Sequence, residues 1–377
     1  MKVAVTTLGF CVAALLALGL VMLYSSSVTQ VGAHYLMMQL IWCAFGFILC
    51  AMATALDYQW LRKFAWPVFI LAVLLLVLVL VPHIGRKING ARRWFDFHGV
   101  RFQPSELGKI ALIILLAWYG DRYQRQMQTW KRGIVFPGAL IALVLGLVFI
   151  EPDRGTTILL ATVSGAMLLV AGVRWKYIVP PVLLGAAALA VSLLHDPMRL
   201  KRIFSWWDLE EHKDGVGYQA YQAMIALGSG GWAGLGLGNG RQKLGFVPED
   251  HTDFIFSIIG EELGLVATLL VILAFVIIAI CGVYIALRAR ETYGSLLAIG
   301  VTFLISLQAA INIGVVTSAL PNKGLPLPFI SYGGSNLLAM LTCVGLLFSV
   351  ARHAPVREGR PAAAAGIDDN PFAAKAT

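Results

Sequence analysis

The sequence predicts an all-α polytopic membrane protein with about ten transmembrane helices and a large extracytoplasmic loop between spans seven and eight. Two observations carry this prediction. The 377 residues are 59% hydrophobic and only 13% charged, whereas a soluble domain has about 25% charged residues. Several apolar runs also reach the roughly 20 residues that a helix needs to cross a bilayer.

The first apolar run resembles a signal peptide, but its length of about 20 residues exceeds the usual apolar core and no clear cleavage motif follows. We therefore expect an uncleaved first span at 5–25. Hydropathy places the other nine at 36–56, 65–82, 104–120, 134–150, 156–173, 177–194, 254–286, 295–320 and 334–351. The eighth is longer than a bilayer requires, which predicts that it tilts or protrudes.

The orientation follows from lysine and arginine in the short loops, which favour the cytoplasmic side. All of these loops fall on one side if both termini are cytoplasmic, and they carry Arg62, Lys63, Arg122, Arg125, Lys131, Arg132, Arg174, Lys176, Arg288 and Arg290. Residues 1–353 are predicted to form one membrane domain. Residues 354–377 are rich in alanine and proline, and we expect a disordered cytoplasmic tail.

Two outward segments oppose this charge rule. Residues 83–106 contain Arg92 and Arg93, and the loop 195–253 contains Lys243 among other cations. One interpretation is a solvated surface that faces lipid headgroups. The other is a site for an anionic ligand, because arginine binds phosphate in a bidentate geometry. A lipid that bears pyrophosphate would suit an outer membrane face, and no nucleic-acid partner is expected.

Two charged motifs stand at the ends of predicted spans. Glu106 and Lys109 in "QPSELGK" are three residues apart, so they share a helix face and can pair. The pair is either a structural contact or part of a substrate cavity, because charges within a span usually face a bundle interior. In "FIEPDRGTT", Asp153 can cap the following helix, or it can act with a second carboxylate to hold a cation.

Two outward segments contain many glycines. In 215–245 we expect a short amphipathic helix at Tyr218 to Leu227, followed by glycines that allow close backbone packing. The run "GLGLGNG" is not a phosphate-binding P-loop, because no strand precedes it and no Lys-Ser/Thr follows it. The segment 320–336, which includes Ser331, is irregular and is expected to line a cavity shared with the other outward loops.

Asp253, in "VPEDHTDFIFSIIGEELG", is the carboxylate that most needs an explanation, because the chain enters a long apolar span directly after it. It could be a helix cap, which accepts backbone N–H bonds. It could also be a general base or a metal ligand, roles that need a carboxylate.

Together these motifs resemble one family. "NGARRWF", "FQPSELGKIAL", "EPDRGTT", "YQAYQAMIALGSGGWAGLGLGNGRQKLGFVPEDHTDFIFSIIGEELG" and "NKGLPLPFISYGGSN" occur in the order found in the SEDS family, the FtsW and RodA peptidoglycan polymerases. The resemblance covers residues 5–352 and is closer to FtsW than to RodA. Two departures stand out: Arg154 replaces a residue that is commonly hydrophobic, and "SYGGSN" replaces "SYGGSS".

The resemblance implies polymerisation of lipid II at the outer face of the bacterial inner membrane, for septal wall synthesis. Asp253 corresponds to the essential aspartate of the family and is the expected catalytic residue. A divalent cation, Mg²⁺ or Mn²⁺, is implied, with Asp253 and Asp153 as candidate ligands. The implied partners are a class B penicillin-binding protein with transpeptidase activity and regulatory membrane proteins of the divisome.

Chemistry of this kind needs cations for the departing pyrophosphate. The candidate substrate-binding residues are Arg92, Arg93, Glu106, Lys109, Lys243 and Ser331. Three alternatives remain open: a flippase or transporter for a lipid-linked precursor, a RodA-type elongation polymerase, and a non-catalytic scaffold. A transporter would need polar groups through the whole depth of the bundle, whereas those in this chain concentrate near the outer face.

Overall fold

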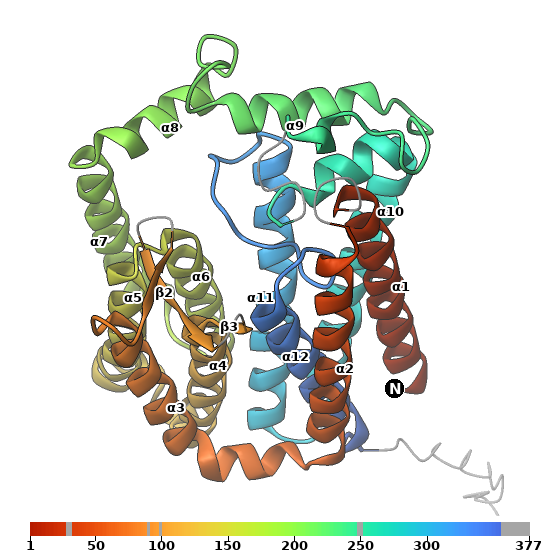
Figure 1. Cartoon of the computed structure of the whole chain (residues 1–377). Helices are drawn as coiled ribbons and strands as arrows, with labels where there is room; N and C mark the ends of the chain where they lie inside the picture. The colour runs from red at the N-terminus through yellow and green to blue at the C-terminus, as the bar shows by residue number, and fades with distance from the viewer. Residues whose placement is uncertain (28–31, 89–90, 98–99, 247–251, 356–377) are drawn as a thin grey trace, which may run out of the picture.

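The computed structural model shows a bundle of long helices, as predicted (Figure 1). It describes residues 1–355 except 28–31, 89–90, 98–99 and 247–251. Ten helices correspond to the ten predicted spans: α1 Lys2–Ser27, α2 His34–Ala55, α3 Tyr58–Leu80, α4 Pro104–Arg122, α5 Phe136–Ile150, α6 Arg154–Val170, α7 Trp175–Leu194, α10 Ile255–Leu287, α11 Thr292–Val316 and α12 Gly334–Arg352. The predicted tail at 354–377 lies almost wholly outside the described residues.

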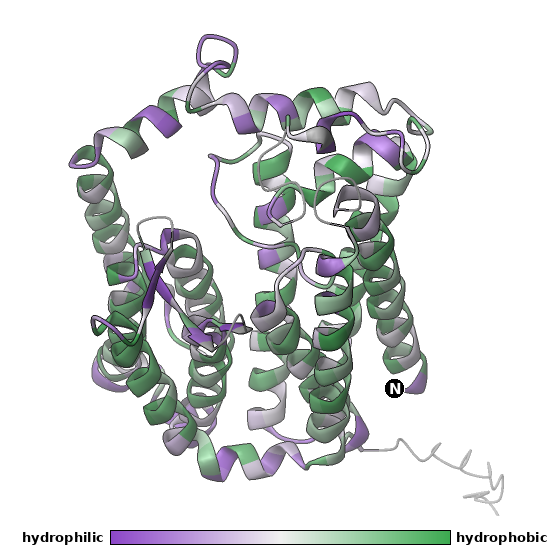
Figure 2. Cartoon of the chain, in the orientation of Figure 1, coloured by the Kyte–Doolittle hydropathy of each residue, from purple (hydrophilic) through white to green (hydrophobic). Residues whose placement is uncertain are grey.

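Eight of these helices are long and apolar enough to cross a membrane by themselves. The other two are α6, which has 17 residues, and α4, which carries buried Glu106 and Lys109. Figure 2 shows apolar residues along the shafts of the helices and polar residues at their ends and in the connections. The chain is therefore an all-α polytopic membrane protein, with α4, α11 and α12 in its interior and α7 almost wholly exposed.

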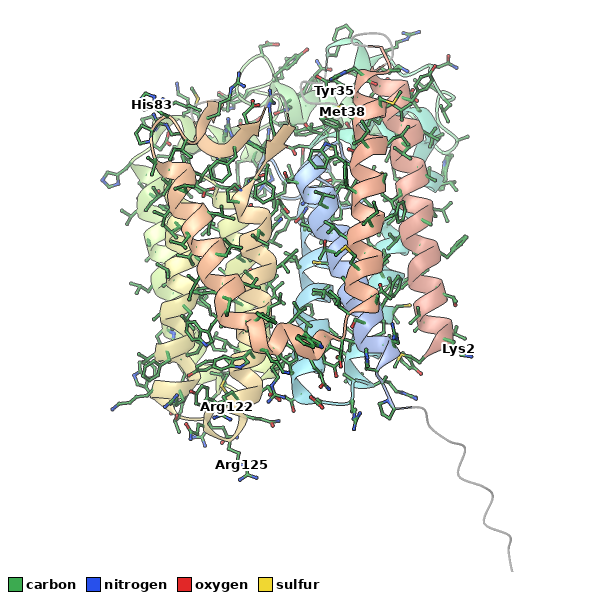
Figure 3. All side chains as sticks on the ribbon, turned by 60° about the horizontal axis from the view of Figure 1, so that its bottom comes forward. Lys2, Tyr35, Met38, His83, Arg122 and Arg125 are labelled. Carbon is green, nitrogen blue, oxygen red and sulfur yellow. The ribbon has the colours of Figure 1, made fainter. Side chains whose placement is uncertain are left out.

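The bundle has two different ends. Figure 3 places Lys2, Arg122 and Arg125 at one end, here called the N-terminal end, and His83, Tyr35 and Met38 at the other, here called the loop end. Because the helices alternate in direction, the short basic connections predicted to be cytoplasmic all fall at the N-terminal end. The long connections after α3, α7 and α11 fall at the loop end.

The loop end contains elements that the sequence did not predict. Residues of the basic 83–106 segment form a three-stranded antiparallel sheet of β1 Arg86–Ile88, β2 Ala91–Phe97 and β3 Val100–Phe102. The long outer loop begins with an unpredicted helix, α8 Pro197–Trp207. The expected short helix is present as α9 Tyr218–Ser229. Short turns of helix occur at Gln124–Gln126, Lys131–Val135 and Gln242–Leu244.

The eighth predicted span, α10, is interrupted, whereas its predicted tilt or protrusion stays a prediction. Gly264 within α10 has φ 77° and ψ −175°, which interrupts the helix. The glycine-rich loop after α9 supplies partners for the freed backbone groups: Leu235 N donates to Glu261 O, and Leu265 N donates to Gly231 O, at 3.0 and 2.9 Å. A side chain on Gly234 would overlap the Glu262 backbone. This is the close packing that the glycines predicted.

A candidate catalytic cavity at the loop end

A cavity of about 570 Å³ opens at the loop end, where four connections of the chain meet. Part of its lining is charged and comprises Arg93, Asp153, Arg154, Arg202, Asp253 and Lys323. Another part is apolar and comprises Ile158 from α6, Leu189 and Leu193 from α7, Ile203 from α8, Ile311 and Val315 from α11, and Leu320. The lining therefore offers both charged groups and apolar surface that suits a hydrocarbon chain.

Asp253 lies in this cavity immediately before α10. The N-cap residue of α10 is Phe254, so the structure does not support the interpretation of Asp253 as the N-cap. Asn312 of α11 fixes its backbone by donating from Nδ2 to Asp253 O at 2.8 Å and to Leu325 O at 2.6 Å. A side chain on Gly324 would overlap Asp253 Oδ2. The glycine thus lets the 317–333 connection lie directly against the carboxylate.

Asp153 also lines the cavity, and it is the N-cap residue of α6, as predicted. Its Oδ1 accepts from Thr156 N at 3.1 Å, and its Oδ2 accepts from Thr156 Oγ1 at 3.0 Å. Gln103 Nε2 lies 3.5 Å from the same Oδ2. Both carboxylate oxygens of Asp153 therefore take part in capping α6.

Arg93 lines the cavity, but its guanidinium is already engaged by the chain. Nε donates to Glu151 O and Nη2 donates to Pro152 O, both at 2.7 Å, and Nη1 lies 3.8 Å from Asp153 Oδ2. Arg92, the preceding residue of β2, is not among the described residues that line the cavity. The β1–β2 pairing is irregular at these residues, since Arg86 pairs with Trp94 and Lys87 with Arg92. Of the two arginines predicted to act together, only Arg93 is among the described lining residues.

Glu151, between α5 and α6, is fully buried, and neither carboxylate oxygen has a hydrogen-bond partner within the described chain. Burial and, second to it, the nearby Asp153 raise the pKa of Glu151 to about 8, although Arg93 opposes the shift. The group is therefore mostly protonated at neutral pH, which avoids an uncompensated buried charge. Its backbone oxygen, rather than its side chain, holds Arg93.

Three cations of the cavity were not among the predicted substrate-binding residues: Arg154, Arg202 and Lys323. Arg154 Nη2 donates to Ser192 of α7, whereas its buried Nη1 has no partner in the described part of the chain. Burial and the neighbouring Arg154 lower the pKa of Lys323, and Asp153 opposes them. In the sequence, Arg154 stands out only as a departure from the family pattern, and no spacing marks Arg202 or Lys323.

The predicted pair of Glu106 and Lys109 forms in α4, with Lys109 Nζ 2.8 Å from Glu106 Oε2. Both side chains are buried, and neither is among the described residues that line the cavity. Asn336 of α12 donates to Glu106 at 3.1 Å, and Lys109 donates to Gln308 of α11 at 3.1 Å. The contacts favour the structural alternative, an ion pair that joins α4 to α11 and α12.

Lys243 and Ser331 also lie apart from the described lining of the cavity. Lys243 is buried, and its Nζ lies 2.7 Å from Glu262 Oε1 and 3.0 Å from Ser25 Oγ. Ser331 Oγ accepts from Leu327 N at 2.7 Å, which closes a turn before α12. Both residues therefore have local structural partners, and their prediction as substrate contacts gains no support from the geometry.

The described residues contain no group of three or more histidine, cysteine or acidic side chains placed to hold a metal ion. A cage made by the protein alone is therefore not present in this part of the chain. Mg²⁺ in enzyme sites is often held by one or two carboxylates together with substrate phosphates. Asp253 in a cavity lined by cations fits that arrangement, with the substrate supplying further oxygens.

Residues 6–355 match the model of the cell cycle protein family of FtsW, RodA and SpoVE. The chain is 40% identical over 346 residues to the "Probable peptidoglycan glycosyltransferase FtsW" of Trichlorobacter lovleyi, covering 90% of this chain and 91% of the relative. It is 39% identical to the protein of the same description from Coxiella burnetii, covering 90% and 94%.

The fold also resembles solved structures, among them the following two. One comes from a study of the structural coordination of polymerization and crosslinking by a peptidoglycan synthase complex, with a TM-score of 0.78, 29% identity and coverage of 92% of this chain and 96% of that one. The other is the rod shape determining protein RodA of Thermus thermophilus, with a TM-score of 0.70, 29% identity and coverage of 93% and 97%.

Proposed function

The chain belongs to the cell cycle protein family of FtsW, RodA and SpoVE, and from this premise we propose how it works as a peptidoglycan glycosyltransferase. It polymerises lipid II into glycan strands for the division wall, as the identity with FtsW proteins over nine-tenths of the chain supports. The observation that carries the mechanism is the position of Asp253 in a cavity that is charged in one part and apolar in another.

The reaction is an inverting glycosyl transfer. A hydroxyl of the acceptor sugar attacks the anomeric carbon of the donor, a carbon–oxygen bond forms there, and the bond to the lipid pyrophosphate breaks. Asp253 takes the proton of the attacking hydroxyl, the task of a general base. Asn312 holds the Asp253 backbone in place by its hydrogen bond, and Gly324 leaves room for the carboxylate. Such fixation reduces the reorganisation that the transition state would otherwise require.

The pyrophosphate leaves with a larger negative charge than it carried in the donor. We assign its stabilisation to Arg154, Lys323 and Arg202, which line the same cavity as Asp253. The buried Nη1 of Arg154 has no partner among the described residues, and an anion beside Lys323 favours its protonated form. Arg93 supports the wall instead, because its donors already bind the Glu151 and Pro152 carbonyls.

The apolar part of the cavity accounts for a lipid-linked donor. Ile158, Leu189 and Ile311 come from three helices, α6, α7 and α11, and they lie beside the charged residues. The α7 surface is also largely exposed on the bundle, where lipid would contact it. The isoprenoid chain of lipid II would lie along this apolar part, with its pyrophosphate against the cations.

A divalent cation, Mg²⁺ or Mn²⁺, would be held by Asp253 and by pyrophosphate oxygens, and it would neutralise charge on the leaving group.

We further propose that both termini are cytoplasmic and that the loop end faces outward from the bacterial inner membrane. The basic connections collected at the N-terminal end support this orientation.

A class B penicillin-binding protein is the proposed partner, since one similar structure belongs to a complex that polymerises and crosslinks. Divisome regulators would bind this assembly.

The test is purified protein with lipid II, alone and with the partner transpeptidase, scored for glycan polymer on a gel. Polymer that depends on this chain supports the proposal. A flippase would instead move lipid II between the leaflets of a vesicle and make no polymer. Failure to polymerise in the presence of the transpeptidase, with transport intact, would replace the polymerase mechanism with that alternative.

A further inference from the structure

A second cavity, of about 480 Å³, lies between the first turns of α3 and the last turns of α4. Its lining residues are Gln59, Arg62, Lys63, Trp66 and Trp118. It is at the N-terminal end of the bundle, where Figure 3 places Arg122, and therefore opposite to Asp253. Its size falls within the roughly 300–1,000 Å³ typical of small-molecule sites, and the glycosyl transfer makes no use of it.

The floor of this cavity is fixed by ion pairs. Arg62 Nη2 lies 2.7 Å from Asp121 Oδ2, and Nη1 lies 3.7 Å from Glu291 Oε2. Gln59 Nε2 donates to Glu291 Oε1 at 3.2 Å. The carboxylates come from the end of α4 and from the residue before α11, so Arg62 is held by two other parts of the bundle. These two negative charges are directed at Arg62 and leave Lys63 uncompensated.

Lys63 has no carboxylate within ion-pair distance in the described part of the chain, and its side chain is exposed. Its Nζ lies 4.9 Å from the centre of the Trp60 ring. Trp66, 41% exposed, packs edge-to-face on Trp118 with ring centres 5.9 Å apart. Tryptophan beside lysine and arginine is typical of the headgroup level of a membrane.

The face of α3 that continues from the cavity toward the loop end is apolar and exposed, so lipid can contact it. Trp66, Ile70 and Leu74 are spaced by four residues, so they form one stripe along α3. Ile70 is 51% exposed and Leu74 is 59% exposed. The cationic cavity thus continues into an exposed hydrocarbon surface, as a site for a molecule with a charged head and an apolar chain requires.

We propose that this cavity binds the headgroup of an anionic phospholipid of the adjacent leaflet. The phosphate lies against Lys63, beside the partly exposed Arg62 that the carboxylates hold in place, and an acyl chain follows the stripe of Trp66, Ile70 and Leu74. A basic pocket between membrane helices is suited to such headgroups. The occupant is a membrane lipid rather than a free phosphate, because only a lipid has a chain that would contact the apolar stripe.

The test measures lipid binding to the full-length protein in delipidated detergent micelles by native mass spectrometry. The probes are phosphatidylglycerol, phosphatidylcholine with the same acyl chains, and inorganic phosphate. The variants are Lys63→Gln, Lys63→Arg and, as a matched control, Arg125→Gln, since Arg125 is an exposed cation at the same end and is not among the described lining residues. Thermal unfolding verifies that each variant is folded.

We expect one phosphatidylglycerol to bind more tightly than phosphatidylcholine. Lys63→Gln should weaken its binding about fivefold, the effect of one cation near an anionic lipid, while Lys63→Arg retains it and Arg125→Gln changes it little. Equal losses in Lys63→Gln and Arg125→Gln would show only diffuse attraction and overturn the site. Equal affinity for the two lipids, or displacement of phosphatidylglycerol by inorganic phosphate, would overturn it as well.

Discussion

Replacing Lys243 with methionine should destabilise the protein strongly, because it leaves Glu262 as an uncompensated buried charge. Both side chains are at most 3% exposed, and Lys243 Nζ lies 2.7 Å from Glu262 Oε1. Removing one partner of such a pair costs about 3–5 kcal/mol. Glu262 keeps hydrogen bonds from Ser25 Oγ and from Gly238 N, so we expect the lower end, about 3 kcal/mol.

The assay is equilibrium unfolding in mixed micelles, followed by tryptophan fluorescence, for Lys243→Met, Glu262→Gln and the double variant. The double variant should recover part of the loss, since it contains no unpaired charge, and the coupling energy should be about 1–3 kcal/mol. Additive losses, or a Lys243→Met protein as stable as the original, would refute a buried pair. A raised KM for lipid II at unchanged stability would instead make Lys243 a substrate contact.

Two further predictions concern the catalytic cavity. Because folding raises the pKa of the buried Glu151 from 4.5 to about 8, the folded state takes up a proton between these values, and its stability falls as pH rises across that window. Glu151→Gln removes this effect, so its gain in Tm should be near zero at pH 5 and largest near pH 8; a gain independent of pH would contradict the shift. Arg154→Gln and Lys323→Gln should each weaken lipid II use by about 1.5–3 kcal/mol, measured as polymer formed at limiting substrate. Arg92→Gln should have little effect, because Arg92 is not among the described residues that line the cavity, and equal losses in all three would disprove the assignment of the cations.

The sequence was sufficient to predict the helices, because each span must satisfy its backbone internally in lipid and so produces a long apolar run. It also predicted the cap at Asp153 and the pair of Glu106 and Lys109, which depend on contacts a few residues apart. The sheet at 86–102 was missed because its strands are short and lie in a basic segment without clear alternation.

The cavity could be predicted only in part. Asp253 was identified through a motif, but its neighbours Asn312 and Gly324 come from segments about 60 and 70 residues away in the chain. Lys243 was assigned to the substrate as a cation of an outward loop that could bind pyrophosphate, whereas the fold buries it against Glu262 of the broken helix α10. Arg92 and Arg93 were grouped as neighbours in sequence, but only Arg93 is among the described residues that line the cavity. No local pattern contains these long-range pairings.

The most direct test of the central claim is the polymerisation of lipid II by Asp253→Asn. Asparagine preserves the shape of the side chain and the backbone contact with Asn312, but an amide is not basic and carries no charge. The mechanism predicts loss of polymer on a gel, with expression, membrane insertion, Tm and transpeptidase binding intact. An Asp253→Asn protein that polymerises lipid II at a near-normal rate would contradict the assignment of Asp253 as the general base.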